Sequence, residues 1–140
     1  RQSMKKYLNI SLIYAIAAMA GGVFYREFTK YQSYTGATAL GKVHGHLFCL
    51  GMLTFLVVAL YGARHDLQKI KSFRVFLWLY NIGVVLTAIM LLIRGVIQVR
   101  GLVLSAAADA SISGIAGIGH IFTGVGILLL LLSFRKIAKN

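Results

Sequence analysis

Three of the four histidines lie in or at the edge of apolar segments, where an ionisable side chain is costly and usually functional. The stretch GKVHGHLFCLG, residues 41–51, contains His44 and His46, and His120 lies within GIAGIGHIFTGVG. A neutral imidazole can bind a metal ion or a haem iron through one ring nitrogen while a neighbouring group fixes the other. These three histidines are therefore candidate ligands, whereas His65 lies in the polar stretch ARHDLQK and is expected to meet water.

Glycines beside two of these histidines favour a flat ligand over a bare ion. Positions three, four and seven residues apart share one face of a helix. The neighbours on these faces are Gly41, Phe48 and Gly51 for His44, and Gly117 and Gly124 for His120. Glycine leaves the space that a macrocycle needs, although a glycine stripe can equally serve only to bring two helices close together. His46 lies about 200° around the helix from His44, so we expect His44 and His120 to be the ligand pair and His46 to have a second role.

Composition places these residues in a membrane protein. The chain is 59% hydrophobic with a mean hydropathy of +0.80 and no proline, which is more apolar surface than a soluble domain of 140 residues can bury. The net charge of +12 would suggest nucleic acid in a soluble protein, but here it fits topology and anionic lipid headgroups, so no nucleic-acid partner is expected. Four segments that lack charged residues are long enough to span a bilayer: 7–25, 43–61, 75–93 and 112–134. The expected fold is all-α, an integral membrane four-helix bundle in a single domain, residues 1–140.

The distribution of basic residues predicts the orientation. Ten of the fifteen Lys and Arg residues lie in the two tails and the loop between the second and third segments, and five lie in the regions 26–42 and 94–111. The positive-inside rule therefore predicts that both termini are cytoplasmic and that the three candidate histidines lie in the outer half of the bilayer. Arg26 and Arg94 end the first and third segments on that side. Guanidinium groups pair well with carboxylates, so both are candidates to hold haem propionates, although arginines often flank membrane spans.

Two resemblances add to these patterns. The whole chain resembles an uncharacterised family of small four-helix membrane proteins of Gram-positive bacteria, chiefly through MKKYLNISLIYAIAAMAGGVFYREFTK and VHGHLF.LGM. That resemblance implies a multi-pass protein of the plasma membrane. VHGHLFCLGML, residues 43–53, is also similar to the second helix of the catalytic subunit of haem–copper oxidases and nitric oxide reductases, where the corresponding histidine binds the low-spin haem. The motif maps onto His44. The chain lacks the further helices and histidines of those enzymes, so oxygen reduction by their mechanism is not expected.

The leading expectation is a membrane protein that binds haem b and transfers electrons, or binds a small gas, in the outer half of the bilayer. A quinol or another respiratory protein is an expected electron partner, and a homo-oligomer is possible. The alternatives are a copper or zinc site, a carrier that supplies haem or metal for oxidase assembly, and a structural or partner-binding protein without a cofactor. The copper or zinc site would use His44, His46 and His120, with Cys49 or Met52 for Cu(I). Whether the protein is an enzyme stays open, but acid–base catalysis is the weakest reading because Glu27, Asp66 and Asp109 all lie outside the spans.

Overall fold

The computed structural model describes the backbone of residues 2–138 and the side chains of residues 4–138. In chain order the helical elements are α1 (Gln2–Tyr31), α2 (Leu40–His46), the π-helix η1 (Leu47–Leu53), α3 (Thr54–Gly62), the 3-10 turn η2 (Leu67–Lys69), α4 (Lys71–Arg100) and α5 (Ala106–Ala138). Elements α2, η1 and α3 follow one another without a break and form one rod. The four rods are long and apolar enough to cross a membrane, and the described residues contain no strand. The all-α prediction with four long apolar helices is confirmed.

The helices extend past the apolar segments from which they were predicted. Helix α4 continues beyond Ile93 to Arg100, and α5 begins at Ala106 rather than at Ile112. Hydropathy detects only the apolar part of a helix, whereas the alanine-rich stretch SAAADAS has a high intrinsic tendency to be helical. Gly101, whose φ is 64°, ends α4 in the left-handed conformation that glycine adopts readily.

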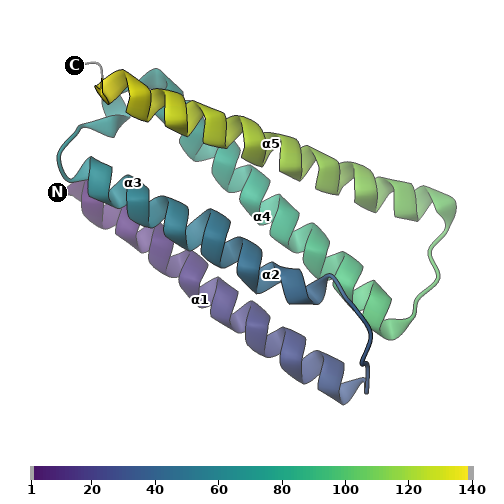
Figure 1. Cartoon of the computed structure of the whole chain (residues 1–140). Coiled ribbons are helices and arrows are strands. Elements are labelled where there is room, and N and C mark those ends of the chain that lie inside the picture. The colour runs from purple at the N-terminus through teal and green to yellow at the C-terminus, as the bar shows by residue number, and fades with distance from the viewer. Residues whose placement is uncertain (1, 139–140) are drawn as a thin grey trace.

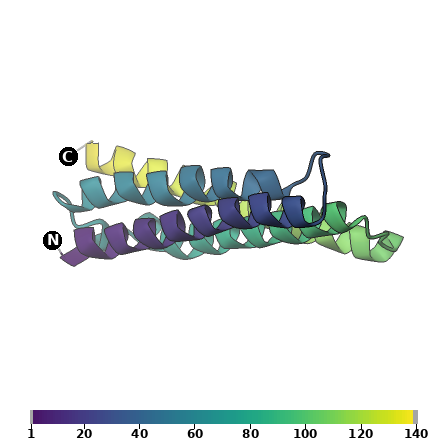
Figure 2. The same ribbon diagram turned by 90° about the horizontal axis from the view of Figure 1, so that it is seen from below.

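The rods form two antiparallel pairs (Figures 1 and 2). Helix α1 packs along the α2–η1–α3 rod, α5 packs along α4, and α2 and η1 join the two pairs by packing against α4. Both termini and the α3–α4 connection lie at one end of the bundle, which we name the termini end. The α1–α2 and α4–α5 connections lie at the other end, which we name the loop end. Helix α4 is central, since 39% of the residues in its most apolar 18-residue stretch are buried. The corresponding fraction for α5 is 17%.

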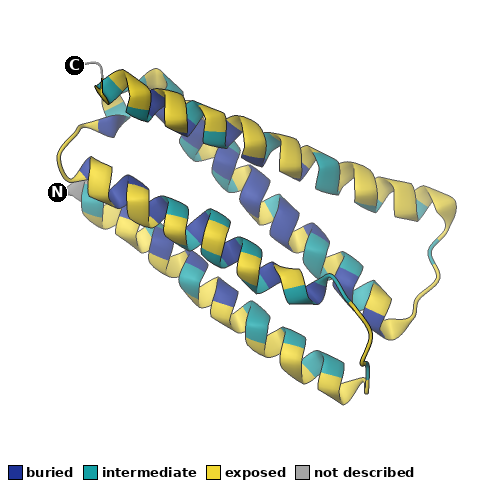
Figure 3. Ribbon diagram, viewed as in Figure 1, coloured by how far each residue is buried: buried dark blue, intermediate teal, exposed yellow. Residues whose placement is uncertain are grey.

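An aromatic cluster forms the core toward the termini end. Phe55, Phe73, Phe76 and Tyr80 are fully buried, and the ring centroids of Phe76 and Tyr80 lie 5.0 Å apart. Figure 3 shows that the outward faces of α1 and α5 are largely exposed. Many of the exposed side chains on all four rods are large and apolar, such as Trp78. A surface of this kind fits contact with lipid rather than with water, so the structure indicates a multi-pass membrane protein.

Glycines bring α4 and α5 into close contact. A Cβ atom at Gly83 would lie 2.6 Å from the backbone nitrogen of Thr123, and one at Gly126 would lie 2.7 Å from Cβ of Tyr80. Small residues at a helix–helix interface allow the backbones to approach, which is the usual way that membrane helices pack. These contacts fix the position of α5, and with it that of His120, relative to α4.

Candidate functional site

The π-helix η1 directly follows the sequence HGH. A π-helix bonds each N–H to the carbonyl five residues earlier, so it holds more residues per turn than the α-helices on either side. Hydroxyl groups from neighbouring helices bond to its carbonyls: Tyr80 Oη donates to Leu50 O, and Ser11 Oγ donates to Met52 O at 2.8 Å. Short π-helical insertions are frequent at functional sites, which directs attention to the two histidines beside this one.

His44 faces α1. A Cβ atom at Gly22 would lie 3.7 Å from His44 Cγ, and the rings of Tyr25 and His44 are stacked with centroids 6.4 Å apart. Nδ1 of His44 is buried and has no hydrogen-bond partner among the described residues. A histidine that binds a metal usually anchors its other ring nitrogen in a hydrogen bond, and His44 lacks that anchor.

The glycines beside His44 do not leave space for a macrocycle. A Cβ atom at Gly41 would lie 3.3 Å from Tyr25 Cζ, and one at Gly51 would lie 2.7 Å from Tyr14 Cβ. These glycines therefore admit two tyrosines of α1, and a haem does not fit beside His44 in this arrangement. The sequence pattern identified a face with little side-chain bulk but not the neighbouring helix that fills it.

His46 and His120 share a hydrogen-bond arrangement that His44 lacks. Nδ1 of His46 lies 2.8 Å from Lys42 O, and Nδ1 of His120 lies 2.7 Å from Ala116 O. A carbonyl oxygen can only accept, so Nδ1 carries the hydrogen, and in a neutral ring Nε2 keeps its lone pair. This is the tautomer of a histidine that binds a metal through Nε2 while its Nδ1–H group is held in place.

Open space surrounds His120. The side chain is exposed on α5, and a Cβ atom at Gly117 or Gly124 would meet no other atom within 4 Å, apart from its own helix backbone and chain neighbours. The space that the sequence predicted beside this histidine is therefore present. An imidazole with a free Nε2 in an apolar helix has lost its hydrogen bonds to water, and a ligand or partner on this face would replace them.

His120 lies on the side of α5 that turns toward the α2–η1–α3 rod. At the termini end that rod and α5 touch, because the rings of Tyr61 and Phe134 are stacked with centroids 4.0 Å apart. His120 precedes Phe134 by two heptads on one continuous helix, so the two side chains differ in direction by about 40°. Figure 1 shows the rod and α5 diverging from this contact toward the loop end.

The second and third candidate histidines lie at about the same level along α4. A Cβ atom at Gly95 of α4 would lie 2.5 Å from Leu40 N, so His46, six residues further along the antiparallel rod, lies near position 89 of α4. Gly119, which precedes the third histidine, packs on position 87 of α4, because a Cβ atom there would lie 2.7 Å from Thr87 Oγ1. Two imidazoles with free Nε2 atoms thus lie at one level, on two rods that both pack against α4.

The two arginines proposed for propionates differ in their surroundings. Arg94 donates to Asp109 Oδ1 at 2.5 Å and to Ser113 Oγ at 3.0 Å, so its guanidinium already has partners on α5. Arg26 is exposed, and its side chain makes no ion pair within residues 4–138. Arg26 is therefore the better placed of the two to accept an added carboxylate.

A three-histidine metal site does not assemble in one chain. Within the described part of the chain, no group of three or more His, Cys, Asp and Glu side chains lies close enough to hold one ion. The reason is the direction of the side chains, since His44 faces α1 and His46 lies on the opposite face of the same helix. Cys49 is exposed, and Phe48 packs half-buried against the core.

Polar side-chain contacts that were not predicted from the sequence join α4 to α1 and to α3. Tyr14 Oη donates to Asn81 Oδ1 at 2.6 Å, and Asn81 Nδ2 donates to Leu77 O at 2.7 Å. Thr54 Oγ1 lies 3.1 Å from Tyr80 Oη. Asn81 is the signal in the sequence that points to these contacts, because a carboxamide inside an apolar segment needs a partner.

Comparison with known proteins places the chain in a family. No curated protein and no solved structure matches it. A family described as "Protein of unknown function (DUF2871)" matches residues 4–137, a range that contains all the candidate histidines. This agrees with the resemblance of the whole chain to an uncharacterised family. Since the match covers nearly the whole length, the chain belongs to the DUF2871 family.

Proposed function

We propose that this chain is a multi-pass protein of the cell membrane that binds haem b between the α2–η1–α3 rod and α5, with His46 and His120 as axial ligands. One observation carries the proposal: Nδ1 of each of these histidines bonds to a backbone carbonyl, which leaves Nε2 free for iron. His46 takes the place that the sequence assigned to His44, because His44 is stacked on Tyr25. The oxidase-like segment contains both histidines, so its likeness to a haem-binding helix is compatible with this change.

The donor set suits haem better than a bare ion. A structural zinc ion is usually held by four protein ligands and a catalytic one by three. The porphyrin of a haem supplies four nitrogen ligands itself, so two imidazoles complete the coordination of the iron. Gly117 and Gly124 have open space where a flat ring could lie, whereas Arg26 lies on α1, away from the space between the rod and α5. The donor set and the open space support haem over the copper and zinc alternatives.

When bound by two imidazoles, a haem supplies one-electron chemistry. The residues of this chain would hold it. The carbonyls of Lys42 and Ala116 fix the two rings and increase the basicity of their Nε2 atoms. A quinol or a respiratory protein is the proposed electron partner, and delivery of haem to an oxidase is the alternative role for the same site.

The proposed orientation follows from charge. The termini end carries the tails and the α3–α4 connection, which contain ten of the fifteen basic residues, so we assign it to the cytoplasm. The histidines of the site lie at the level of the middle of α4, so we place them near the midplane of the membrane rather than in its outer half. The resemblance to proteins of Gram-positive bacteria supports the plasma membrane as the location.

The test is the absorption spectrum and haem content of the full chain, expressed with ample haem and purified in detergent. The parent protein should carry one haem per chain with a six-coordinate low-spin spectrum. His46→Ala and His120→Ala should each abolish that spectrum, and added imidazole should restore it by filling the empty axial position. His44→Ala is the matched control from the same turn of helix and should keep the spectrum.

Two results would contradict the proposal in different ways. Loss of the spectrum in His44→Ala but not in His46→Ala would return the ligand to His44 and would mean that α1 moves away when haem binds. A parent protein that binds no haem under these conditions would refute haem binding altogether.

A cofactor-free role in helix association is the second candidate function. The observation in its favour is that Gly114, Gly117 and Gly124 all lie on α5 with open space around them. Small residues of this kind let another membrane helix approach closely. A haem-free protein whose oligomeric state changes when Gly117 and Gly124 are replaced by leucine would favour this function.

A further inference from the structure

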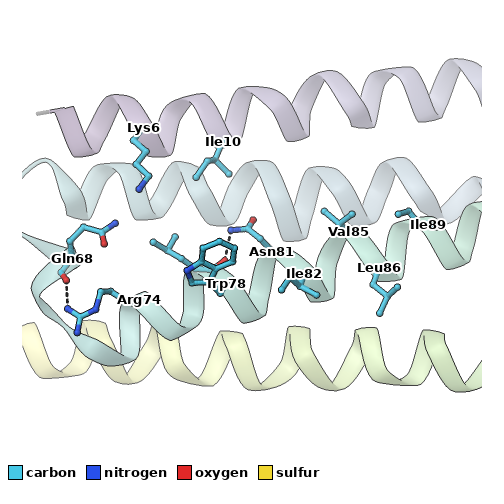
Figure 4. A pocket seen from close by; sticks show the side chains of 11 residues that line it. Lys6, Ile10, Gln68, Arg74, Trp78, Asn81, Ile82, Val85, Leu86 and Ile89 are labelled. Atoms are coloured by element: carbon cyan, nitrogen blue, oxygen red, sulfur yellow. Dashed lines mark hydrogen bonds between the residues drawn. The ribbon is translucent and has the colours of Figure 1, made fainter.

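A long groove runs along α4 on the side that faces α1. One cavity of about 660 Å³ lies toward the termini end, and a second of about 490 Å³ lies toward the loop end. Val85 and Ile89 line both cavities, so the two form one continuous groove. Figure 4 shows the first cavity, with side chains from α1 and α4 on its two sides.

The groove is basic only at the termini end, and the polar groups of Asn81 and Tyr14 farther along it are bonded to each other. Lys6, Gln68 and Arg74 lie there, and Val85, Leu86 and Ile89 lie at the far end of the first cavity (Figure 4). No carboxylate lines either cavity. An anion that enters this end therefore meets two positively charged side chains, while Asp66, whose charge acts on Tyr7 beside Gln68, lies outside the cavity lining.

Hydrogen bonds hold the basic end in shape. Arg74 Nη1 donates to Gln68 O at 2.6 Å, and Gln68 Nε2 donates to Tyr7 Oη at 2.9 Å. Gln68 therefore links α1 to the start of α4, the two helices that carry Lys6 and Arg74. The Lys6 side chain makes no ion pair in the part of the chain that the structure describes.

The dimensions match one leaflet of a bilayer. Arg74 and Ile89 are separated on α4 by about 22 Å at 1.5 Å per residue. Half of a bilayer, from the headgroup region to the midplane, measures roughly 20–22 Å. Trp78 lies near the basic end, at the depth where tryptophan is enriched in membrane proteins. A free phosphate would use only the basic end and would leave the apolar length of the groove unexplained.

We propose that this groove binds an anionic phospholipid from the leaflet on the termini side. The phosphate lies between Lys6 and Arg74, and one acyl chain lies along α4 past Ile82 and Leu86 to Ile89. The charge of the groove, its length and the apolar rods around it all favour this occupant. None of these features involves the histidines, so lipid binding stands or falls separately from haem binding.

Trp78 is the single tryptophan of the chain and lines the groove, so its fluorescence reports on the occupant. The full chain is reconstituted into vesicles of phosphatidylcholine that contain increasing fractions of phosphatidylglycerol with brominated acyl chains, which quench tryptophan on contact. Brominated phosphatidylcholine serves as the reference lipid. Phosphatidylglycerol should compete for the site at least tenfold better than the reference, since each basic residue contributes about fivefold.

Lys6→Gln and Arg74→Gln should each lower this preference about fivefold. Lys6 is exposed and unpaired, so its variant keeps the test valid if Arg74→Gln does not fold. The matched control removes two charges at the same end but outside the groove, by Arg135→Gln together with Lys136→Gln on α5, and should leave the preference unchanged.

Three outcomes would overturn the proposal. Equal quenching by the two lipids would show that the groove does not select an anionic headgroup. A loss in the α5 control as large as that in the groove variants would assign the preference to general surface charge. Loss of the preference on adding millimolar inorganic phosphate at constant ionic strength would identify the basic end as a site for a free anion.

Discussion

Replacing Gly51 with alanine tests the contact on which the interpretation of the HGH region depends. In the structure the Tyr14 side chain packs directly against Gly51 in the π-helix η1, and a Cβ atom there would lie 2.7 Å from Tyr14 Cβ. The close neighbours include the first atoms of that side chain, so rotation of a flexible tip cannot relieve the clash. Either α1 or the tyrosine must move, and movement breaks the bond from Tyr14 Oη to Asn81.

The expected effect follows from three contributions. Overpacking of a tight site costs about 1–3 kcal/mol, and loss of the Tyr14–Asn81 hydrogen bond costs about 0.5–1.5 kcal/mol more. The greater helix propensity of alanine returns up to about 1 kcal/mol. We therefore expect Gly51→Ala to lower the free energy of unfolding by about 0.5–4.5 kcal/mol.

The assay is reversible unfolding in mixed micelles, followed by far-UV circular dichroism as the fraction of denaturing detergent rises. Gly45→Ala is the matched control on the same rod, because a Cβ atom at Gly45 would meet nothing within 4 Å. The control should be neutral or slightly stabilising. In a double-mutant cycle, Gly51→Ala should cost less in a Tyr14→Ala background than in the parent protein, since the clash is then gone. Equal stability of the Gly51 and Gly45 variants would refute the close packing of α1 on η1.

Three further predictions concern topology and packing. A cysteine introduced in the region 65–72 should resist an impermeant thiol reagent on intact cells and one in 30–38 should react, and the reverse labelling would invert the orientation. Gly119→Leu should separate α4 from α5 and lower the free energy of unfolding by about 1–3 kcal/mol in the same micelle assay, a change that a loosely packed pair would not show. Arg94→Ala and Asp109→Asn should each destabilise by about 0.2–1 kcal/mol, and a double-mutant cycle without coupling between them would mean that the ion pair contributes nothing.

The helices could be predicted because their signal is local. Each apolar segment lies inside a helix of the structure, and the absence of proline is consistent with long rods. Helix ends were less predictable, since α5 begins in a polar, alanine-rich stretch before Ile112 that hydropathy does not register. The π-helix was not predictable from LFCLGML, because the hydroxyl groups that bond to its carbonyls come from Ser11 and Tyr80, which are distant in sequence.

The candidate site was predictable in residue type but not in direction. The sequence singled out His44, His46 and His120 as candidates by residue type and setting, and helical periodicity separated the first two onto different faces. Periodicity cannot say which neighbour each face meets. Gly41 is an example, because a glycine that leaves room for a ligand and a glycine that leaves room for Tyr25 of α1 look the same in the sequence.

The π-helix also makes chain length a determinant of side-chain direction. A π-helix within a longer helix is equivalent to one inserted residue. Deleting a residue from 47–53 would let the segment close as an α-helix and rotate the preceding turn by about 100° relative to α3. His44 would then leave Tyr25, and His46 would turn to a different face of the rod, although neither residue had been changed. The number of residues in η1, as much as their chemistry, thus determines which histidine faces which neighbouring helix.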